Sequence, residues 1–421
     1  MAIFVTPSSI IYCNPEVSGA AVYNLPTAME GKAAQAKYSG VERQLEIYQA
    51  GLRGAGLAVP ISPDLLEQRA KEVLEPRAYD YVAGAAGGEL TARANREAFY
   101  RWRIVPRMLR DVSQRDLSIE LLGRNLPAPV LLGPVGVQGI IHGEAELATA
   151  RAAAALGLVS VLSTVSSRPL EQVAQAAGDG PRWFQLYWTT HAEVTASLLR
   201  RAEAAGYSAL VVTLDTAILG WRERDLRHPY LPFLLGEGLA NFFSDPVFRS
   251  LLSRPAQEDP VAAVRLWASI CSHTALTWKD LAFLREHTRL PILLKGILHA
   301  EDARRTLDCG VDGLIVSNHG GRQVDGAIAA LDALPEVVQA VRGSVPVLFD
   351  SGIRRGADAI KAIALGARAV LLGRLYIWGL AVAGEQGVRE VLLNFLADLD
   401  VSLALSGYRS CRELRQEALM R

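Results

Sequence analysis

The chain lacks the features that mark several large classes of protein. Its 44 Lys and Arg residues balance 44 Asp and Glu residues, so no excess of one charge indicates a nucleic-acid partner or an anionic membrane. No uninterrupted apolar run is long enough to span a bilayer. The N-terminus has no basic region and carries Pro7 early, which argues against a secretory signal. The few cysteines form neither a CxxC pair nor a disulfide framework, as is typical of a reducing cytoplasm: Cys13, Cys271, Cys309 and Cys411.

Two absent motifs restrict the choice of cofactor. No GxGxxG follows a first strand, so the sequence does not indicate a Rossmann dinucleotide site. There is also no HExxH and no paired His or Cys cluster, so we expect no metal. Any cofactor must therefore be held by another kind of site.

What the chain does have is a large apolar content in a regular order. Half of the 421 residues are hydrophobic, which is ample for a large core. Continuous short apolar runs alternate with helical stretches, and such runs are typical of strands buried on both faces of a parallel sheet. Eight such units predict a closed (β/α)8 TIM barrel rather than an open doubly wound sheet. The predicted strands span residues 128–134, 159–163, 182–187, 209–215, 291–295, 313–318, 345–350 and 369–373.

The remaining segments predict an extension, a helical prelude and an insertion. Residues 1–41 have weak periodicity and are expected to form a poorly ordered N-terminal extension, whereas residues 42–421 form the barrel domain. A helix is predicted over 63–83, ended by the glycine cluster 84–88. After the fourth strand, the long stretch from 215 to 278 is rich in aromatic, proline and charged residues. Such an insertion usually covers the mouth of a barrel.

The stretch GLIVSNHGGRQ, residues 313–323, is the strongest chemical signal. A buried strand ends there in His319 and Arg322 with two glycines between them. Histidine exchanges protons near neutral pH, and the arginine fork matches a carboxylate. The pattern predicts proton abstraction from a substrate held by its carboxylate. The alternative is a strand–turn–helix connection with a capping polar residue.

The other predicted strand ends suggest a phosphate site and a flat heterocycle. DSGIRRG and GR follow the seventh and eighth strands, where barrels commonly hold a phosphate, and they supply Arg354 and Arg374. Gln185, Thr213 and Lys295 offer neutral or cationic hydrogen-bonding groups at neighbouring strand ends. A phosphate plus a polar-edged heterocycle fits flavin mononucleotide (FMN) best. Each residue also has a structural reading, in which lysine and arginine pair with carboxylates and the aspartates serve as hydrogen-bond partners.

Several of these runs resemble one known family, the FMN-dependent α-hydroxy acid oxidases and dehydrogenases. The resemblance covers about residues 42–421 and also includes the helix that carries Tyr81. Gly136 and three further runs most resemble the branch that contains the lactate 2-monooxygenases: GWRERDL (220–226), FSDPVF (243–248) and GYRSCREL (407–414). The runs that carry the family resemblance are SNHGGRQ (317–323), DSGIRRG (350–356), FQLY (184–187) and LKG (294–296).

The resemblance implies roles for individual residues. His319 would be the general base, Asp215 would stabilise its protonated form, and Tyr187 and Lys295 would assist catalysis. The substrate would be bound by Tyr81, Tyr187, Arg222, His319 and Arg322. FMN would be bound by Pro134, Val135, Gly136, Ser163, Gln185, Thr213, Lys295, Ser317, Asp350, Ser351, Gly352, Ile353, Arg354, Gly373 and Arg374.

The resemblance also implies an activity. We expect oxidation of an L-2-hydroxy acid, L-lactate in the first place, with O2, giving acetate, CO2 and water. The alternatives are an oxidase that releases the keto acid and H2O2, a dehydrogenase that passes electrons to another acceptor, an FMN-barrel isomerase, and a barrel that only binds phosphate. Thr164 and Val165 stand where glycolate oxidase has serine and tryptophan, which changes the pocket wall. By analogy we expect a cytoplasmic homotetramer or homo-octamer with no nucleic-acid or membrane partner.

Overall fold

The computed structural model describes residues 5–6, 9–10 and 38–421. The chain divides into two compact units, 1–35 and 36–421. In the first, β1 (Val5–Thr6) pairs antiparallel with β2 (Ser9–Ile10). Most of the predicted N-terminal extension lies outside the described residues.

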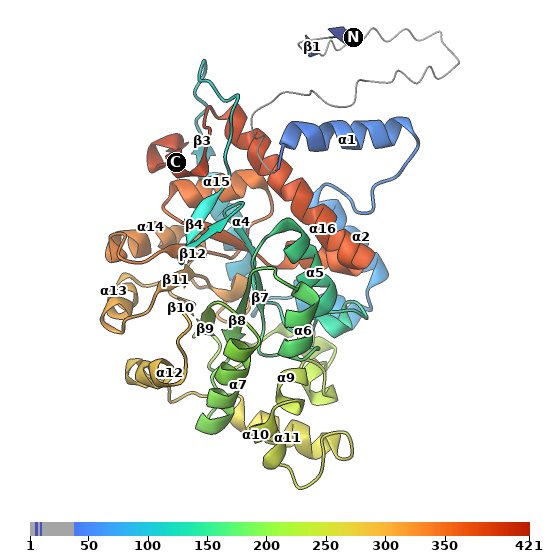
Figure 1. Cartoon of the computed structure of the whole chain (residues 1–421), viewed down its shortest axis with the longest axis vertical. Coiled ribbons are helices and arrows are strands. Elements are labelled where there is room, and N and C mark those ends of the chain that lie inside the picture. The colour runs from blue at the N-terminus through green and yellow to red at the C-terminus, as the bar shows by residue number, and fades with distance from the viewer. Residues whose placement is uncertain (1–4, 7–8, 11–37) are drawn as a thin grey trace. The chain divides into compact units, whose positions relative to one another are not determined.

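The second unit is built on a closed barrel of eight parallel strands (Figure 1), which confirms the predicted fold. Closure is made between the last and first strands, where Val370 pairs with Val130. Every strand falls inside a predicted run and ends at most two residues before the end of that run, close to where the polar residues begin. The strands are β6 (Val130–Leu132), β7 (Ser160–Leu162), β8 (Arg182–Leu186), β9 (Leu210–Thr213), β10 (Ile292–Lys295), β11 (Gly313–Val316), β12 (Val347–Phe349) and β13 (Ala369–Leu372).

The barrel interior is a packed core whose floor is closed by a hairpin. Leu131, Trp183 and Leu348 belong to an inner cluster, whereas the flanking residues of each strand pack outward on the helices, as strand alternation requires. The hairpin of β4 (Ile119–Leu121) and β5 (Arg124–Leu126) packs on this cluster from the N-terminal end of the barrel. The C-terminal end is therefore the end at which a site can form.

An outer ring of helices covers the barrel. Each follows its strand and buries an apolar face against the sheet. The longest is kinked at Ala383 and Gly384, where the backbone leaves helical geometry. The ring consists of α5 (Glu146–Leu156), α6 (Leu170–Ala177), α7 (Ala192–Ala204), α12 (Leu281–His287), α13 (Ala300–Asp308), α14 (Ala330–Val341), α15 (Gly356–Ala364) and α16 (Arg374–Leu405).

The segment before the barrel differs from the prediction in one respect. The single helix expected over 63–83 is wrong, because the chain forms α2 (Pro63–Val73) and α3 (Pro76–Ala83). Pro76 disfavours helical geometry at the residue before it and provides no N–H, so one helix ends and the next begins with proline at its first position. The break lets α3 take its own direction, and α3 carries Tyr81. The neighbouring helices are α1 (Gly40–Leu52) and α4 (Leu90–Arg101).

The insertion after β9 folds into short helices. Two of them are capped by side chains: Asp245 accepts hydrogen bonds from the first turn of its helix, and Asp259 does the same. These helices are α8 (Glu223–Arg227), α9 (Ala240–Phe243), α10 (Pro246–Ser250) and α11 (Pro260–Ile270), with the 3-10 turn η2 (Pro232–Leu235).

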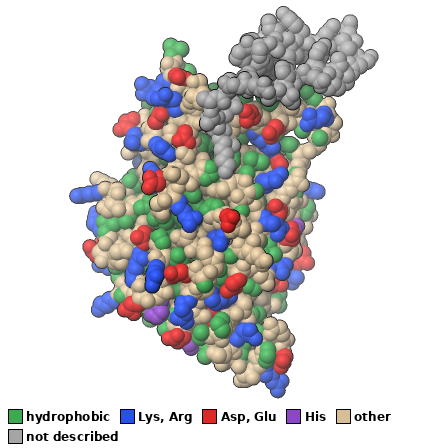
Figure 2. Space-filling view, in the orientation of Figure 1, with side chains coloured by type: hydrophobic (Ala, Val, Ile, Leu, Met, Phe, Trp, Pro, Cys, Tyr) green, Lys and Arg blue, Asp and Glu red, His purple; other side chains and the backbone are tan. Residues whose placement is uncertain are grey.

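The surface has no dominant charge. Figure 2 shows Lys and Arg side chains interspersed with Asp and Glu over one face of the molecule. In the part of the chain that the structure describes, no helix combines the length and apolar character needed to cross a membrane.

Candidate active site

A cavity of about 400 Å³ opens at the C-terminal ends of the barrel strands. Its walls come from three sources that lie far apart in the sequence. Strand ends supply Lys295 and His319, α3 supplies Tyr81, and the insertion supplies Arg222 and Phe233. The insertion thus covers the mouth as predicted.

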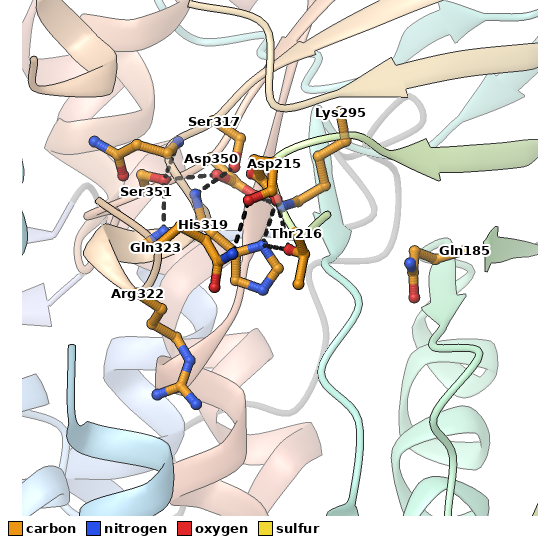
Figure 3. A network of polar contacts seen from close by, with 12 residues as sticks. Gln185, Asp215, Thr216, Lys295, Ser317, His319, Arg322, Gln323, Asp350 and Ser351 are labelled. Carbon is orange, nitrogen blue, oxygen red and sulfur yellow. Dashed lines mark hydrogen bonds and ion pairs between the residues drawn. The ribbon is translucent and has the colours of Figure 1, made fainter. Parts of the chain in front are cut away.

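His319 and Asp215 form a hydrogen-bonded pair at the ends of β11 and β9 (Figure 3). The imidazole Nδ1 lies 2.7 Å from Asp215 Oδ1, and Thr216 donates its hydroxyl to the same carboxylate oxygen at 2.9 Å. An ionised carboxylate can only accept, so Nδ1 carries the proton and Nε2 is left as the basic nitrogen. His319 also lines the cavity. The pair can therefore accept a proton from a bound molecule at Nε2.

The turn that presents His319 is tightly held. His319 has φ of +57° and Gly320 has φ of +66°, a left-handed conformation that is costly for a non-glycine residue. The His319 amide donates to Ser317 Oγ at 3.0 Å, and the Gly320 amide donates to Ser351 Oγ at 3.0 Å. In the SNHGG run, the serine and the glycine thus help to hold the backbone in the conformation that places the imidazole on the cavity wall.

Lys295 lies between two carboxylates. Its Nζ is 3.7 Å from Asp215 Oδ2 and 3.6 Å from Asp350 Oδ2. Burial would lower the pKa of Lys295, but the two carboxylates outweigh burial and raise it. Burial likewise opposes ionisation of Asp215, yet Lys295 and His319 hold its pKa well below the usual range. The pKa of His319 is lowered by burial, against the pull of Asp215, so the imidazole is neutral and basic near neutral pH.

Two arginines face the same cavity as His319. Arg322 donates to the backbone oxygens of Tyr81 and Gly84, both at 2.7 Å. Arg222 donates to the Arg322 backbone oxygen at 3.2 Å and to Gln323 Oε1 at 3.1 Å. Burial and the neighbouring Arg222 lower the pKa of Arg322 to about 10. These two neighbouring cations, Arg222 buried and Arg322 partly buried, form a site for an anion such as a carboxylate.

Two tyrosines complete the wall around these cations. Burial raises the pKa of Tyr187 to about 12, so its hydroxyl stays a hydrogen-bond donor. The Tyr81 ring lies 5.2 Å from the Arg322 guanidinium, a cation–π contact that fixes both groups. Imidazole, guanidinium groups and phenols thus converge on one cavity, as the sequence predicts.

A second region of the site has unpaired polar atoms that suit a heterocycle. Gln185 Nε2 and Thr213 Oγ1 are buried, and neither has a hydrogen-bond partner among the described residues. Ser163 Oγ donates to Gln185 Oε1 at 3.1 Å and so orients that amide. Native proteins rarely leave buried donors and acceptors unpaired, so these atoms indicate a bound group that the protein itself does not supply.

The third region suits a phosphate. Arg354 and Arg374 line the cavity, and their hydrogen bonds within the described chain go to backbone oxygens. Burial, then Arg322 and Arg354, lower the pKa of Arg374 to about 9. Gly373 has open space where a Cβ would stand, so its backbone can approach a ligand closely. Clustered cations without a carboxylate partner fit the phosphate of FMN.

The predicted residues separate into those on the cavity wall and those behind it. Among the predicted residues that the structure describes, Asp215 and Ser317 lie behind the wall. Asp215 acts through His319, and Ser317 accepts a hydrogen bond from the His319 amide. On the wall are Tyr81, Pro134, Val135, Gly136, Tyr187, Arg222, Lys295, His319, Arg322, Asp350, Ser351, Gly352, Ile353, Arg354, Gly373 and Arg374. Ser163, Gln185 and Thr213 are also behind the wall.

The sequence missed the aromatic residues that the insertion adds to the cavity wall. Phe233, Phe242 and Trp267 line the cavity and pack on one another, with Phe233 and Trp267 ring centroids 5.0 Å apart. The aromatic content of the insertion was a signal, but its irregular chain gave no register from which to choose these residues.

Comparison with known proteins agrees with this geometry. A family profile described as FMN-dependent dehydrogenase matches residues 70–421. An FMN-dependent alpha-hydroxy acid dehydrogenase of Penicillium citrinum is 47% identical over 382 residues, covering 90% of this chain and 95% of the relative. An L-lactate oxidase of Lysinibacillus sphaericus is 48% identical over 356 residues, covering 85% and 92%. The solved structure of mandelate oxidase with (S)-4-hydroxymandelic acid is 41% identical, with a TM-score of 0.77 over 86% of this chain and 98% of that one.

Barrel, cavity and matches together define a flavin-dependent oxidoreductase. The chain belongs to the family of FMN-dependent α-hydroxy acid dehydrogenases and oxidases, and its cofactor is FMN. The unpaired Gln185 and Thr213 atoms and the arginines at the phosphate end fit that cofactor.

Proposed function

We propose that this protein oxidises L-lactate with O2 as a lactate 2-monooxygenase, giving acetate, CO2 and water. The observation that carries the proposal is the convergence of the His319–Asp215 pair with Arg222 and Arg322 on one covered cavity. A 2-hydroxy acid has one carboxylate for the arginines and one α-carbon for the base. Relatives named L-lactate oxidase support lactate as the first substrate to test.

Each residue has a defined task in this proposal. Arg222 and Arg322 hold the substrate carboxylate, and the Tyr81 and Tyr187 hydroxyls orient it. His319 Nε2 takes up the proton, and Asp215 stabilises the imidazolium that forms. FMN, when bound, would supply the two-electron acceptor that O2 reoxidises. Buried Lys295 keeps its positive charge and would stabilise negative charge that develops near it on reduction.

The fate of the keto acid decides between two overall reactions. If it leaves first, lactate and O2 give pyruvate and H2O2. If it stays, the H2O2 formed beside it oxidatively decarboxylates it in place, giving acetate, CO2 and water. The cover formed by the insertion favours retention, since Phe233 and Trp267 add an apolar wall to the cavity. The absence of a side chain at Gly136 does not enlarge the cavity. A Cβ there would lie 2.6 Å from Val165 Cγ2, so Val165 already fills that space.

The second candidate is an L-lactate oxidase. It is favoured by the names of the relatives, which include L-lactate oxidases of Lysinibacillus sphaericus and Nostoc. An oxidase would bind the same substrate with the same residues. It would differ from the monooxygenase in releasing the keto acid sooner.

One assay separates the two candidates. The holoenzyme is incubated with L-lactate in air, with catalase present, and acetate and pyruvate are quantified. Catalase is needed because free H2O2 also decarboxylates pyruvate in solution. Acetate as the main product supports the monooxygenase, whereas accumulation of pyruvate with O2 evolution by catalase identifies the oxidase.

Two further proposals accompany this function. We propose a homotetramer or homo-octamer, which mass photometry of the purified holoenzyme tests directly. We also propose a cytoplasmic location, which fractionation of the native cells tests.

A further inference from the structure

Asp225 is a buried carboxylate that the mechanism above does not use. It lies on α8, three residues after Arg222, and is 8% exposed. Neither of its carboxylate oxygens has a hydrogen-bond partner among the described residues. A buried carboxylate without a hydrogen-bond partner is costly, so its presence beside a binding site calls for a function.

The charges nearest to Asp225 are the two arginines of the carboxylate site. Arg222 Nη1 lies 3.8 Å from Asp225 Oδ2, and Arg322 is the opposite charge that acts on Asp225 most strongly. On the facing helix α3, Asp80 adds a like charge, although it is itself paired with Arg227 and other cations. Burial raises the pKa of Asp225, against the opposing pull of Arg322 and Arg222.

Asp225 does not set the position of Arg222. The 3.8 Å separation is too long for a hydrogen bond, and the Arg222 side chain is held instead by the Arg322 backbone oxygen and by Gln323 Oε1. When the Asp225 charge is removed, these other acceptors should therefore keep Arg222 in its position. What Asp225 contributes is its electrostatic field.

We propose that Asp225 acts through Arg222 and Arg322 to weaken their hold on anionic ligands, so that carboxylates bind reversibly and the keto acid can leave. This inference rests on the carboxylate site of the proposed function. Without Asp225, the two cations would face the bound carboxylate with less competing negative charge. The substrate would bind more tightly, and so would the product.

The test compares binding of a carboxylate and of its amide. Pyruvate and pyruvamide are titrated into oxidised holoenzyme by calorimetry, without turnover. A unit charge acting over several ångströms in a protein interior changes anion affinity by about ten- to thirtyfold. Asp225→Asn should therefore bind pyruvate about ten- to thirtyfold more tightly and leave pyruvamide affinity unchanged. A purely structural role would change both ligands together.

Two control variants make the comparison specific. Glu223→Gln removes the same charge from the same helix at an exposed position and should leave pyruvate affinity unchanged. Asp225→Ser removes the charge with a smaller side chain and should reproduce the effect of Asp225→Asn, which keeps the test valid if one variant folds poorly. Under turnover with L-lactate, the Asn variant should show a lower KM, a lower kcat and a higher ratio of acetate to pyruvate.

The outcomes separate this inference from the proposed function. Unchanged or weaker pyruvate binding in both folded Asp225 variants overturns the inference. In that case Arg322→Met serves as the reference. If it abolishes pyruvate binding, the carboxylate site stands and only the role of Asp225 is lost. If it too has no effect, the carboxylate site itself is wrong.

Discussion

Asp215 joins His319 and Lys295 through its two carboxylate oxygens. Oδ1 accepts from the imidazole Nδ1 at 2.7 Å, and Oδ2 lies 3.7 Å from the lysine Nζ. One buried negative charge therefore serves both the proposed proton acceptor and the cation beside the heterocycle site. Because these three residues come from separate strands, all three strands must be positioned correctly for both contacts to form.

Asp215→Asn should lower the rate and change its pH dependence. kcat/KM requires neutral His319, so it rises with pH through the pKa of His319 and then levels. Burial already lowers that pKa from about 6.5, and Asp215 opposes the shift. Without the carboxylate the imidazolium is less stable, so the rise should move to lower pH. The plateau should fall by about a hundredfold or more, because the base is weaker.

A pH series of kcat/KM for L-lactate, measured for both proteins, checks this prediction. A variant whose rise moves to higher pH would show that Asp215 does not stabilise the protonated imidazole. Thr216→Val is the matched control, since it removes a hydroxyl bonded to the same carboxylate oxygen and leaves the charge in place.

Arg322→Met should weaken binding of the substrate carboxylate. Loss of one partner of a buried charge-assisted pair costs about 2–5 kcal/mol. We expect the apparent affinity for L-lactate to fall accordingly, as measured by anaerobic flavin reduction at varied lactate concentration. Arg224→Met is the control, because Arg224 pairs with Glu89 and is not among the cavity-wall residues. Equal effects of the two substitutions would refute the clamp.

Thr213→Val should separate cofactor binding from protein stability. Thr213 Oγ1 has no partner among the described residues, so the apoprotein loses no hydrogen bond and its Tm should stay within a few degrees. The FMN dissociation constant should rise about fivefold, for roughly 1 kcal/mol of lost hydrogen bonding. Flavin fluorescence quenching measures this constant. An unchanged FMN affinity would mean that the hydroxyl does not face the cofactor.

The sequence was most informative where strands end. Continuous apolar runs predicted all eight strands, because a parallel barrel buries both faces of each one. Polar residues directly after those runs predicted part of the cavity wall, since parallel strands bring their carboxyl ends to one rim. His319 and Arg322 were evident for this reason.

The features that the sequence did not predict depend on tertiary contacts, which leave no periodic pattern in the sequence. The break before Pro76 was missed because the apolar spacing continues across it. Phe233 and Trp267 lie in a segment without regular periodicity, so only the fold brings them to the cavity. Asp225 could not be singled out either, because its lack of a hydrogen-bond partner depends on the residues around it in the fold and not on its own sequence.

The base assignment is the central claim, and one rapid-mixing measurement tests it most directly. His319→Gln holoenzyme is mixed anaerobically with saturating L-lactate, and flavin absorbance is followed. FMN should remain bound, while the reduction rate should fall by about 10²–10⁴-fold or more, because the proton has no acceptor at the former Nε2 position. Reduction at the unsubstituted rate would contradict the account.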